Sequence, residues 1–334
     1  MKIPLQKILQ AYDESRSKLS LQSVIYSGTY FSDKTGSLIK KNVSLNEYLI
    51  CKRIMVLSAH ALTASRQKKL QTAELYYKQA NFEYWLRLLG LQARLHCVSS
   101  LCSTKAYFKY CENNFVEAQQ IIFQANDADI ILEEKFGIYL LHMHRIQLAH
   151  NLIRIDVKTG NYSRALSRSI EAIQYLNSSV FNISYLKGPW GSYFLKRIQP
   201  SLIRDMTIQI LHEMALVNSA YQWNDGLKEI LHGYYTLIDT TALQPRFLQW
   251  LRLKINFHER KIDIFLEETM DFMKNERGNT SLLYFLLIPD LISTLEKIDP
   301  DTTKQLCIKI RDDLPMWTGT PRFLKEKIKK CVER

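Results

Sequence analysis

Residues 160–172 read GNYSRALSRSIEA, a polar corner followed by a helical segment with small residues seven positions apart, Ala165 and Ala172. Ser169 lies four positions after Ala165, so all three residues occupy one stripe of a helix. Small side chains on such a stripe allow a neighbouring helix to approach closely. Two earlier stretches have the same spacing: Ala73, Tyr77 and Ala80, and then Ala118, Ile122 and Ala125.

These stretches recur with steps of 45 residues (73 to 118) and 47 residues (118 to 165). Each follows a polar corner, at 65–69, 112–114 and 158–161. A recurring unit of this size indicates helical hairpins that bury their apolar faces on their neighbours. Such a stack favours a binding surface over an active site.

The composition also favours helices. In 334 residues there are only 11 glycines and 8 prolines, so turns are widely separated. A hydrophobic content of 46% excludes wholesale disorder, because there is ample apolar surface to bury. We therefore predict an all-α chain, an α-solenoid of stacked antiparallel helical hairpins with irregular, long repeats.

The third unit resembles the tetratricopeptide repeat. The order and spacing of five residues match that family: Leu152, Gly160, Tyr162, Ala165 and Ala172. Ile153 and Ser169 depart from it, since the family favours glycine and a large aromatic residue there. The period is longer than the 34 residues of the family. The resemblance covers about residues 60–176 and implies a tetratricopeptide-like helical repeat protein that binds a partner, with no activity implied.

The pattern divides the chain into four parts: an N-terminal helix and loop (1–43), tetratricopeptide-like repeats (44–176), an irregular insertion (177–200), and degenerate helical repeats with a basic capping helix (201–334). Within the first part, the polar segment 27–42 is predicted to be a loop. Ser44 and Glu47 form a capping-box pattern ahead of the repeats. Weaker corners are predicted at 222–225 and 258–261, and a helix start at Pro300.

The net charge is +12, but the basic residues do not form a dense run, and the most basic segment is the C-terminus. A solvated basic surface is therefore favoured over dedicated nucleic-acid binding. Six irregularly spaced cysteines indicate a reducing compartment, the cytosol or the nucleus. The N-terminus lacks the apolar core of a signal peptide, and the longest apolar run, 282–288, is too short to span a bilayer. We expect no membrane insertion.

Motifs for catalysis or metal binding are not found. His142, His144 and His150 share one segment, but the first two point about 200° apart on a helix and cannot jointly bind one metal. Glu229 and His232 form a single Glu-x-x-His pair without the second pair that a di-iron bundle needs. No metalloprotease, nucleophile-elbow, P-loop or dinucleotide motif occurs. We expect a non-enzymatic protein without a cofactor, and tyrosines that line a core or groove.

The concave face of such a stack is formed by the first helix of each hairpin. In the best-matched unit, the first-helix residues not used for packing are predicted to be His150, Asn151, Arg154 and Lys158. By the resemblance, Asn151 and Arg154 would hold the backbone and carboxylates of a partner, although a plain solvated helix face has the same pattern. Trp190, in a Gly-Pro-Trp-Gly loop, is a candidate aromatic anchor or a plug between repeats.

Three functions are compatible with these features. The first is a scaffold or adaptor that binds a protein partner as a subunit of a complex. The positive net charge favours an acidic partner. The second is a helical repeat protein associated with nucleic acid, and the third is a ligand-sensing regulator built on similar repeats. The sequence leaves the partner and the oligomeric state open.

Overall fold

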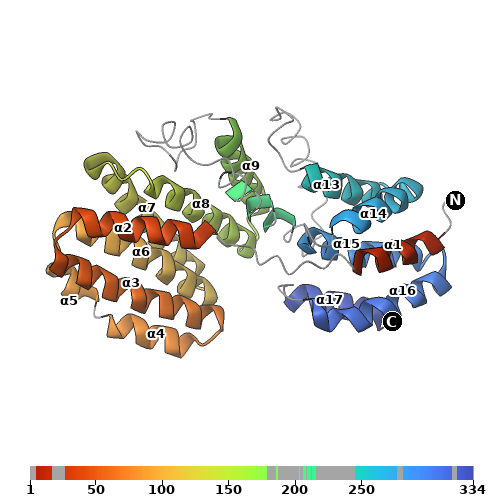
Figure 1. The fold of residues 1–334 in the computed structure, drawn as a ribbon, viewed down its shortest axis with the longest axis horizontal. Coiled ribbons are helices and arrows are strands. Elements are labelled where there is room, and N and C mark those ends of the chain that lie inside the picture. The colour runs from red at the N-terminus through yellow and green to blue at the C-terminus, as the bar shows by residue number, and fades with distance from the viewer. Residues whose placement is uncertain are drawn as a thin grey trace. The chain divides into compact units, whose positions relative to one another are not determined.

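The structure is a computed structural model that describes residues 5–16, 27–80, 82–178, 186, 203, 206–207, 209–211, 213–215, 245–276, 281–317 and 322–333. The regular elements of these residues are helices, which confirms the all-α prediction for them. They belong to two compact units (Figure 1). Unit 1 combines Met1–Val24 with Leu211–Arg334, and unit 2 is Ile25–Ile210.

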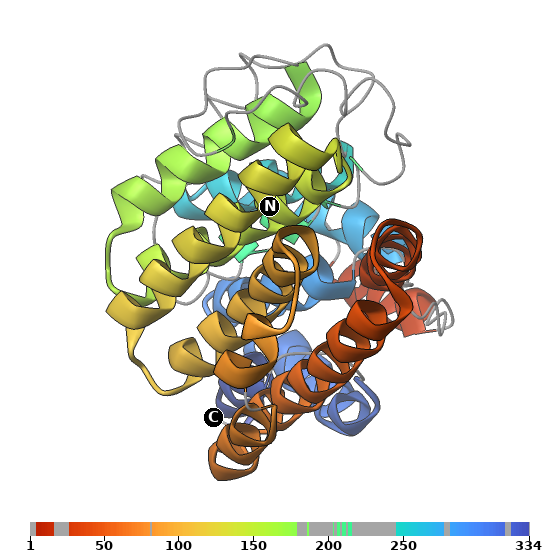
Figure 2. The same cartoon turned by 90° about the vertical axis from the view of Figure 1, so that its left-hand side faces the viewer.

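Unit 2 contains the segment in which the repeats are predicted. Its helices are α2 (Ser27–Asn42), α3 (Leu45–Arg66), α4 (Leu70–Gln79), α5 (Phe82–Arg87), α6 (Leu91–Cys111), α7 (Phe115–Phe136), α8 (Leu141–Lys158) and α9 (Tyr162–Ser178). The pairs α3–α4, α6–α7 and α8–α9 form hairpins, and α6 and α8 each also pack on a helix of the hairpin before. In Figure 2 the colours pass from red through orange and yellow to green across this unit.

The hairpin corners have one shared conformation. Lys68, Asn113 and Gly160 each have a φ between 61° and 75° and lie two residues before the next helix. The amide of the following residue donates to a carbonyl five residues earlier, as in Asn161 N to Asp156 O at 2.8 Å. This bond closes the first helix in a Schellman motif. The three predicted corners are therefore confirmed, and they are structurally equivalent.

The first small residue of each stripe is buried in its hairpin. Ala73, Ala118 and Ala165 lie three residues after the start of the second helix, and none has exposed surface. Ala118 and Ala125 pack in one cluster with Cys102 of α6 and Leu152 of α8. The absence of a bulky side chain thus lets α7 contact two first helices at once.

First helices of successive hairpins also contact each other in register. The thiols of Cys51 in α3 and Cys97 in α6 are 3.3 Å apart. Ser99 Oγ in α6 lies 3.2 Å from His144 Nδ1 in α8. These contacts join residues 46 and 45 positions apart, close to the steps of 45 and 47 residues between the repeated stretches of the sequence.

The prediction of a loop at 27–42 was wrong, because this segment forms α2. Its polar and glycine content argues against a helix, yet Ile39 is buried in a cluster with Ile54 of α3 and Cys97 of α6. Burial of this one apolar turn outweighs weak intrinsic propensity, which is usual for helices in proteins. The capping box of Ser44 and Glu47 is present as predicted, at the start of α3.

Unit 1 contains α1 (Gln6–Arg16), α13 (Pro245–His258), α14 (Ile262–Glu276), α15 (Ser281–Leu295), α16 (Pro300–Asp313), a 3₁₀ turn (Leu314–Met316) and α17 (Arg322–Val332). The first helix of the sequence packs on α14 and α16. Tyr12 donates to the buried Asp313 at 2.8 Å, and Arg16 pairs with the same carboxylate at 2.8 Å. The predicted N-terminal part, 1–43, is therefore divided between the two units.

The predicted corner at 258–261 repeats the geometry of unit 2. Arg260 has a φ of 58° two residues before α14, and Lys261 N donates to Asn256 O at 2.9 Å. Pro300 begins α16 behind the N-cap Asp299, as predicted. The basic terminal helix α17 packs on α15 and α16 through the buried Leu324 and Ile328. The corner at 222–225 lies outside the described residues, as does the 177–200 insertion apart from the end of α9 and Leu186.

Substitutions at two of the corners should change the stability in opposite directions. A side chain in the left-handed region costs about 1 kcal/mol, which glycine avoids. We expect Lys68→Gly to raise the free energy of unfolding by about 0.5–1 kcal/mol in urea denaturation, and Gly160→Ala to lower it by about 1 kcal/mol. A Cβ on Gly160 meets no atom within 4 Å, so its cost would be conformational. Equal effects of the two substitutions would contradict the equivalence of the corners.

Candidate functional site

The predicted partner-facing residues of α8 occupy different environments. His150 is only 5% exposed, so its assignment as a residue not used for packing was wrong. The cause is the position of α8, which packs on both α7 and α9 and leaves only a narrow strip exposed. Asn151 and Arg154 are half-buried and Lys158 is exposed. Trp190, Glu229 and His232 lie outside the described residues.

Asn151 and Arg154 do line a cleft together. Its other walls are Ala106, Tyr107, Tyr110, Ile122 and Ile155, from α6, α7 and α8. Tyr107 and Tyr110 stack on each other with ring centroids 6.0 Å apart, and burial raises the pKa of Tyr107 above its ordinary value. The open volume is about 10 Å³, room for about one water. These tyrosines therefore form a groove wall, and a partner would contact the rim of the cleft.

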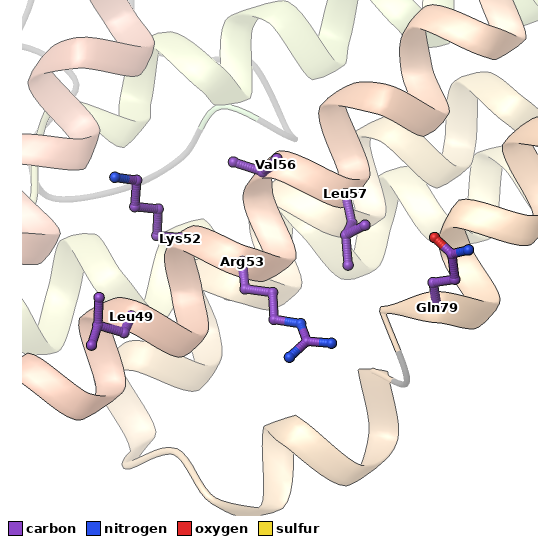
Figure 3. A pocket seen from close by; sticks show the side chains of 6 residues that line it. All are labelled: Leu49, Lys52, Arg53, Val56, Leu57 and Gln79. Atoms are coloured by element: carbon purple, nitrogen blue, oxygen red, sulfur yellow. The ribbon is translucent and has the colours of Figure 1, made fainter.

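A larger hollow lies on α3, and the sequence interpretation did not include it. It has a volume of about 550 Å³ and is lined by Leu49, Lys52, Arg53, Val56 and Leu57 of α3 and by Gln79 at the end of α4 (Figure 3). Leu49 is 54% exposed and Val56 45%, and Leu45 on the same helix is 68% exposed. We call the surface formed by these seven residues the α3 face.

Two cations give the α3 face its charge. Lys52 and Arg53 are both exposed, and neither forms an ion pair with any residue that the structure describes. The Arg53 guanidinium lies over the ring of Trp85 in α5, 5.2 Å from the centroid. The face therefore combines aliphatic side chains with unneutralised positive charge, which suits an amphipathic acidic ligand.

A cluster of buried polar side chains connects α6, α7, α8 and α9. His144 Nδ1 lies 2.8 Å from Asp129 Oδ2, and Arg145 Nη1 donates to Glu133 Oε2 at 2.9 Å. His142 contacts Glu133 and the Tyr175 hydroxyl. His142 and His144 thus have separate partners. All these side chains are buried, so the cluster holds helices together and does not face a substrate.

Within the described residues, no group of three or more His, Cys, Asp or Glu side chains is placed to hold a metal ion. The same part of the chain contains no helix with the length and apolarity needed to cross a bilayer. All six cysteines are free thiols. Unit 2 therefore offers two candidate sites, the α3 face and the rim of the α8 cleft, and unit 1 has a hollow of about 560 Å³ beside the start of α14.

Comparison of the chain with protein-family models, curated proteins and solved structures finds no match.

A buried histidine near the polar cluster, His96, leads to a prediction about pH. His96 of α6 is buried, and this burial lowers its pKa to about 4, while Asp129 acts weakly in the opposite direction. Because an unfolded histidine titrates near pH 6.5, the unfolded chain binds this proton first as the pH falls. Stability from a neutral His96 is therefore lost between about pH 6.5 and pH 4, by about 2–3 kcal/mol.

The check is urea denaturation at several pH values in that window. His96→Leu should lose less stability than the wild type as the pH falls, since leucine binds no proton. If the free energies of unfolding of the two proteins fell equally with pH, the pKa of His96 would be the same in the folded and the unfolded chain.

Proposed function

We propose that the chain is a non-enzymatic scaffold or adaptor that holds a protein partner in a groove between helices, as a subunit of a complex. Unit 2 serves as a short solenoid of tetratricopeptide-like hairpins. The equivalent corners and the register of α3, α6 and α8 support this proposal, because repeated hairpins packed in register produce extended binding surfaces. The free thiols agree with a cytosolic or nuclear location.

The observation that carries the proposal is the α3 face. Single exposed leucines are ordinary on protein surfaces, but here Leu45, Leu49 and Val56 occur on one helix beside a hollow of about 550 Å³. Contiguous apolar surface next to unpaired charge is typical of docking sites. Lys52 and Arg53 would select an acidic partner.

The alternatives have less support from the geometry. Base stacking would use tyrosines such as Tyr107 and Tyr110, yet these form the wall of a cleft that admits about one water. A ligand-sensing regulator would need an enclosed pocket for a small molecule, whereas the hollow on α3 lies on the surface. Neither alternative explains why aliphatic residues are exposed on α3.

Affinity capture from native lysate, with and without nuclease, tests the proposal. We expect a nuclease-resistant protein that is lost with Leu49→Ser/Val56→Ser. Val116→Ser is the matched control, because this residue is 71% exposed on α7, away from the α3 face. Asn151→Ala/Arg154→Glu tests the rim of the α8 cleft separately.

Capture of nucleic acid that nuclease removes would replace the scaffold proposal with the nucleic-acid alternative. A partner lost only with the α8 variant would keep the scaffold function and move the docking site to the cleft. A partner retained by both variants would exclude both surfaces. Circular dichroism of each variant should match that of the wild type, since the substituted side chains are not buried.

A further inference from the structure

The equivalent corners allow residues of α3 to be matched with residues of α8. Lys68 and Gly160 are equivalent and 92 positions apart (160 − 68). The same offset matches four residues of the α3 face with α8: Leu49 with Leu141, Lys52 with His144, Arg53 with Arg145, and Val56 with Leu148. A face of α3 can therefore be compared, residue by residue, with the same face of a later helix.

In α8 this face is covered by the second helix of the preceding hairpin. Leu141 and Leu148 are each 2% exposed, where Leu49 and Val56 are 54% and 45% exposed. Leu141 packs with Leu132 of α7. Leu148 belongs to the cluster that contains Ala118, Ile121, Ile122 and Ala125 of the same helix. The intervening first helix differs, since Cys97 of α6, the counterpart of Lys52, packs on Cys51 of α3.

The polar residues of this face also have partners in α8. His144, the counterpart of Lys52, lies 2.8 Å from Asp129. Arg145, the counterpart of Arg53, pairs with Glu133 at 2.9 Å. Both acids come from the C-terminal half of α7 and are one helical turn apart. Two basic positions on the first helix thus meet two acids on the covering helix.

For α3 the structure describes no preceding hairpin, so its basic and aliphatic residues remain exposed. We propose that the α3 face binds an acidic amphipathic helix of a partner protein, which takes the place that α7 occupies on α8. Its acids, one turn apart, pair with Lys52 and Arg53. Its apolar residues fill the hollow between Leu49 and Val56. This inference rests on the proposed function and specifies the partner's chemistry and its site.

The C-terminal half of α7 provides the probe. A labelled synthetic peptide of residues 122–136, IFQANDADIILEEKF, carries Asp129, Glu133 and the apolar residues that pack on α8. Short isolated helices are marginal in water, so a staple between positions 123 and 127, which are exposed in α7, keeps it helical. Fluorescence anisotropy measures its binding to the full chain.

We expect the peptide to bind the wild type, and Lys52→Glu/Arg53→Glu to weaken this binding at least about tenfold at low salt. Lys40→Glu/Lys41→Glu is the matched control, because it makes the same change in charge at exposed positions of α2. A second peptide with Asp129→Lys and Glu133→Lys should prefer the Lys52→Glu/Arg53→Glu chain. This exchange of preference separates charge pairing from a loss of folding.

Absence of binding to the wild type, or binding that Lys52→Glu/Arg53→Glu leaves unchanged, would overturn the inference. The scaffold proposal would survive that result if lysate capture still depended on Leu49 and Val56, or on Asn151 and Arg154. A photoreactive amino acid at Val56 identifies the natural occupant. Cross-links to an acidic helical segment of another protein support the inference. Cross-links within this chain, to a second copy, or to nucleic acid contradict it.

Discussion

The close approach of two helices at a residue without a bulky side chain is the constraint on which unit 2 depends. The left-handed corner residue returns the chain within three residues, so the second helix starts against the end of the first. Ala73, Ala118 and Ala165, at the fourth position of the second helix, have no exposed surface, so a larger side chain would not fit without moving the helices. Because the corner and the alanine recur at the same offset, successive hairpins meet their neighbours with the same faces, and the register between first helices follows.

A buried ion pair between Glu133 of α7 and Arg145 of α8 restricts which helix can pack on this face of α8. Burying Glu133 and Arg145 costs desolvation free energy, and their mutual attraction roughly offsets it, so the pair adds little net stability. Removing one partner, however, would leave an uncompensated buried charge. A helix without acids at the positions of Asp129 and Glu133 is therefore disfavoured on this face of α8. The ion pair thus affects which helix packs on α8 more than it affects the free energy of unfolding.

Features that depend on neighbouring residues could be predicted from the sequence, and those that depend on distant ones could not. The corners, the capping box at Ser44 and the helix start at Pro300 are local, and the structure has them as predicted. The helix α2 was missed because burial of Ile39 against α3 and α6 decides it. His150 was assigned to the surface because the sequence does not show that helices flank α8 on both sides. The α3 face was missed for the converse reason: Leu49 and Val56 have the spacing of core residues, and only the structure shows that no described helix covers them.

The same kinds of side chain can hold two helices of this chain together or bind a helix of another protein. In α8, an aliphatic and polar face is covered by the preceding helix, α7. On α3, no described helix covers the matching residues, and polar side chains there would suit exposure to water. Here α3 retains Leu49 and Val56 and carries Lys52 and Arg53 where α8 has His144 and Arg145. The α3 face thus has the composition of a covered face rather than that of a solvated one, which is why we propose that one more helix packs on it.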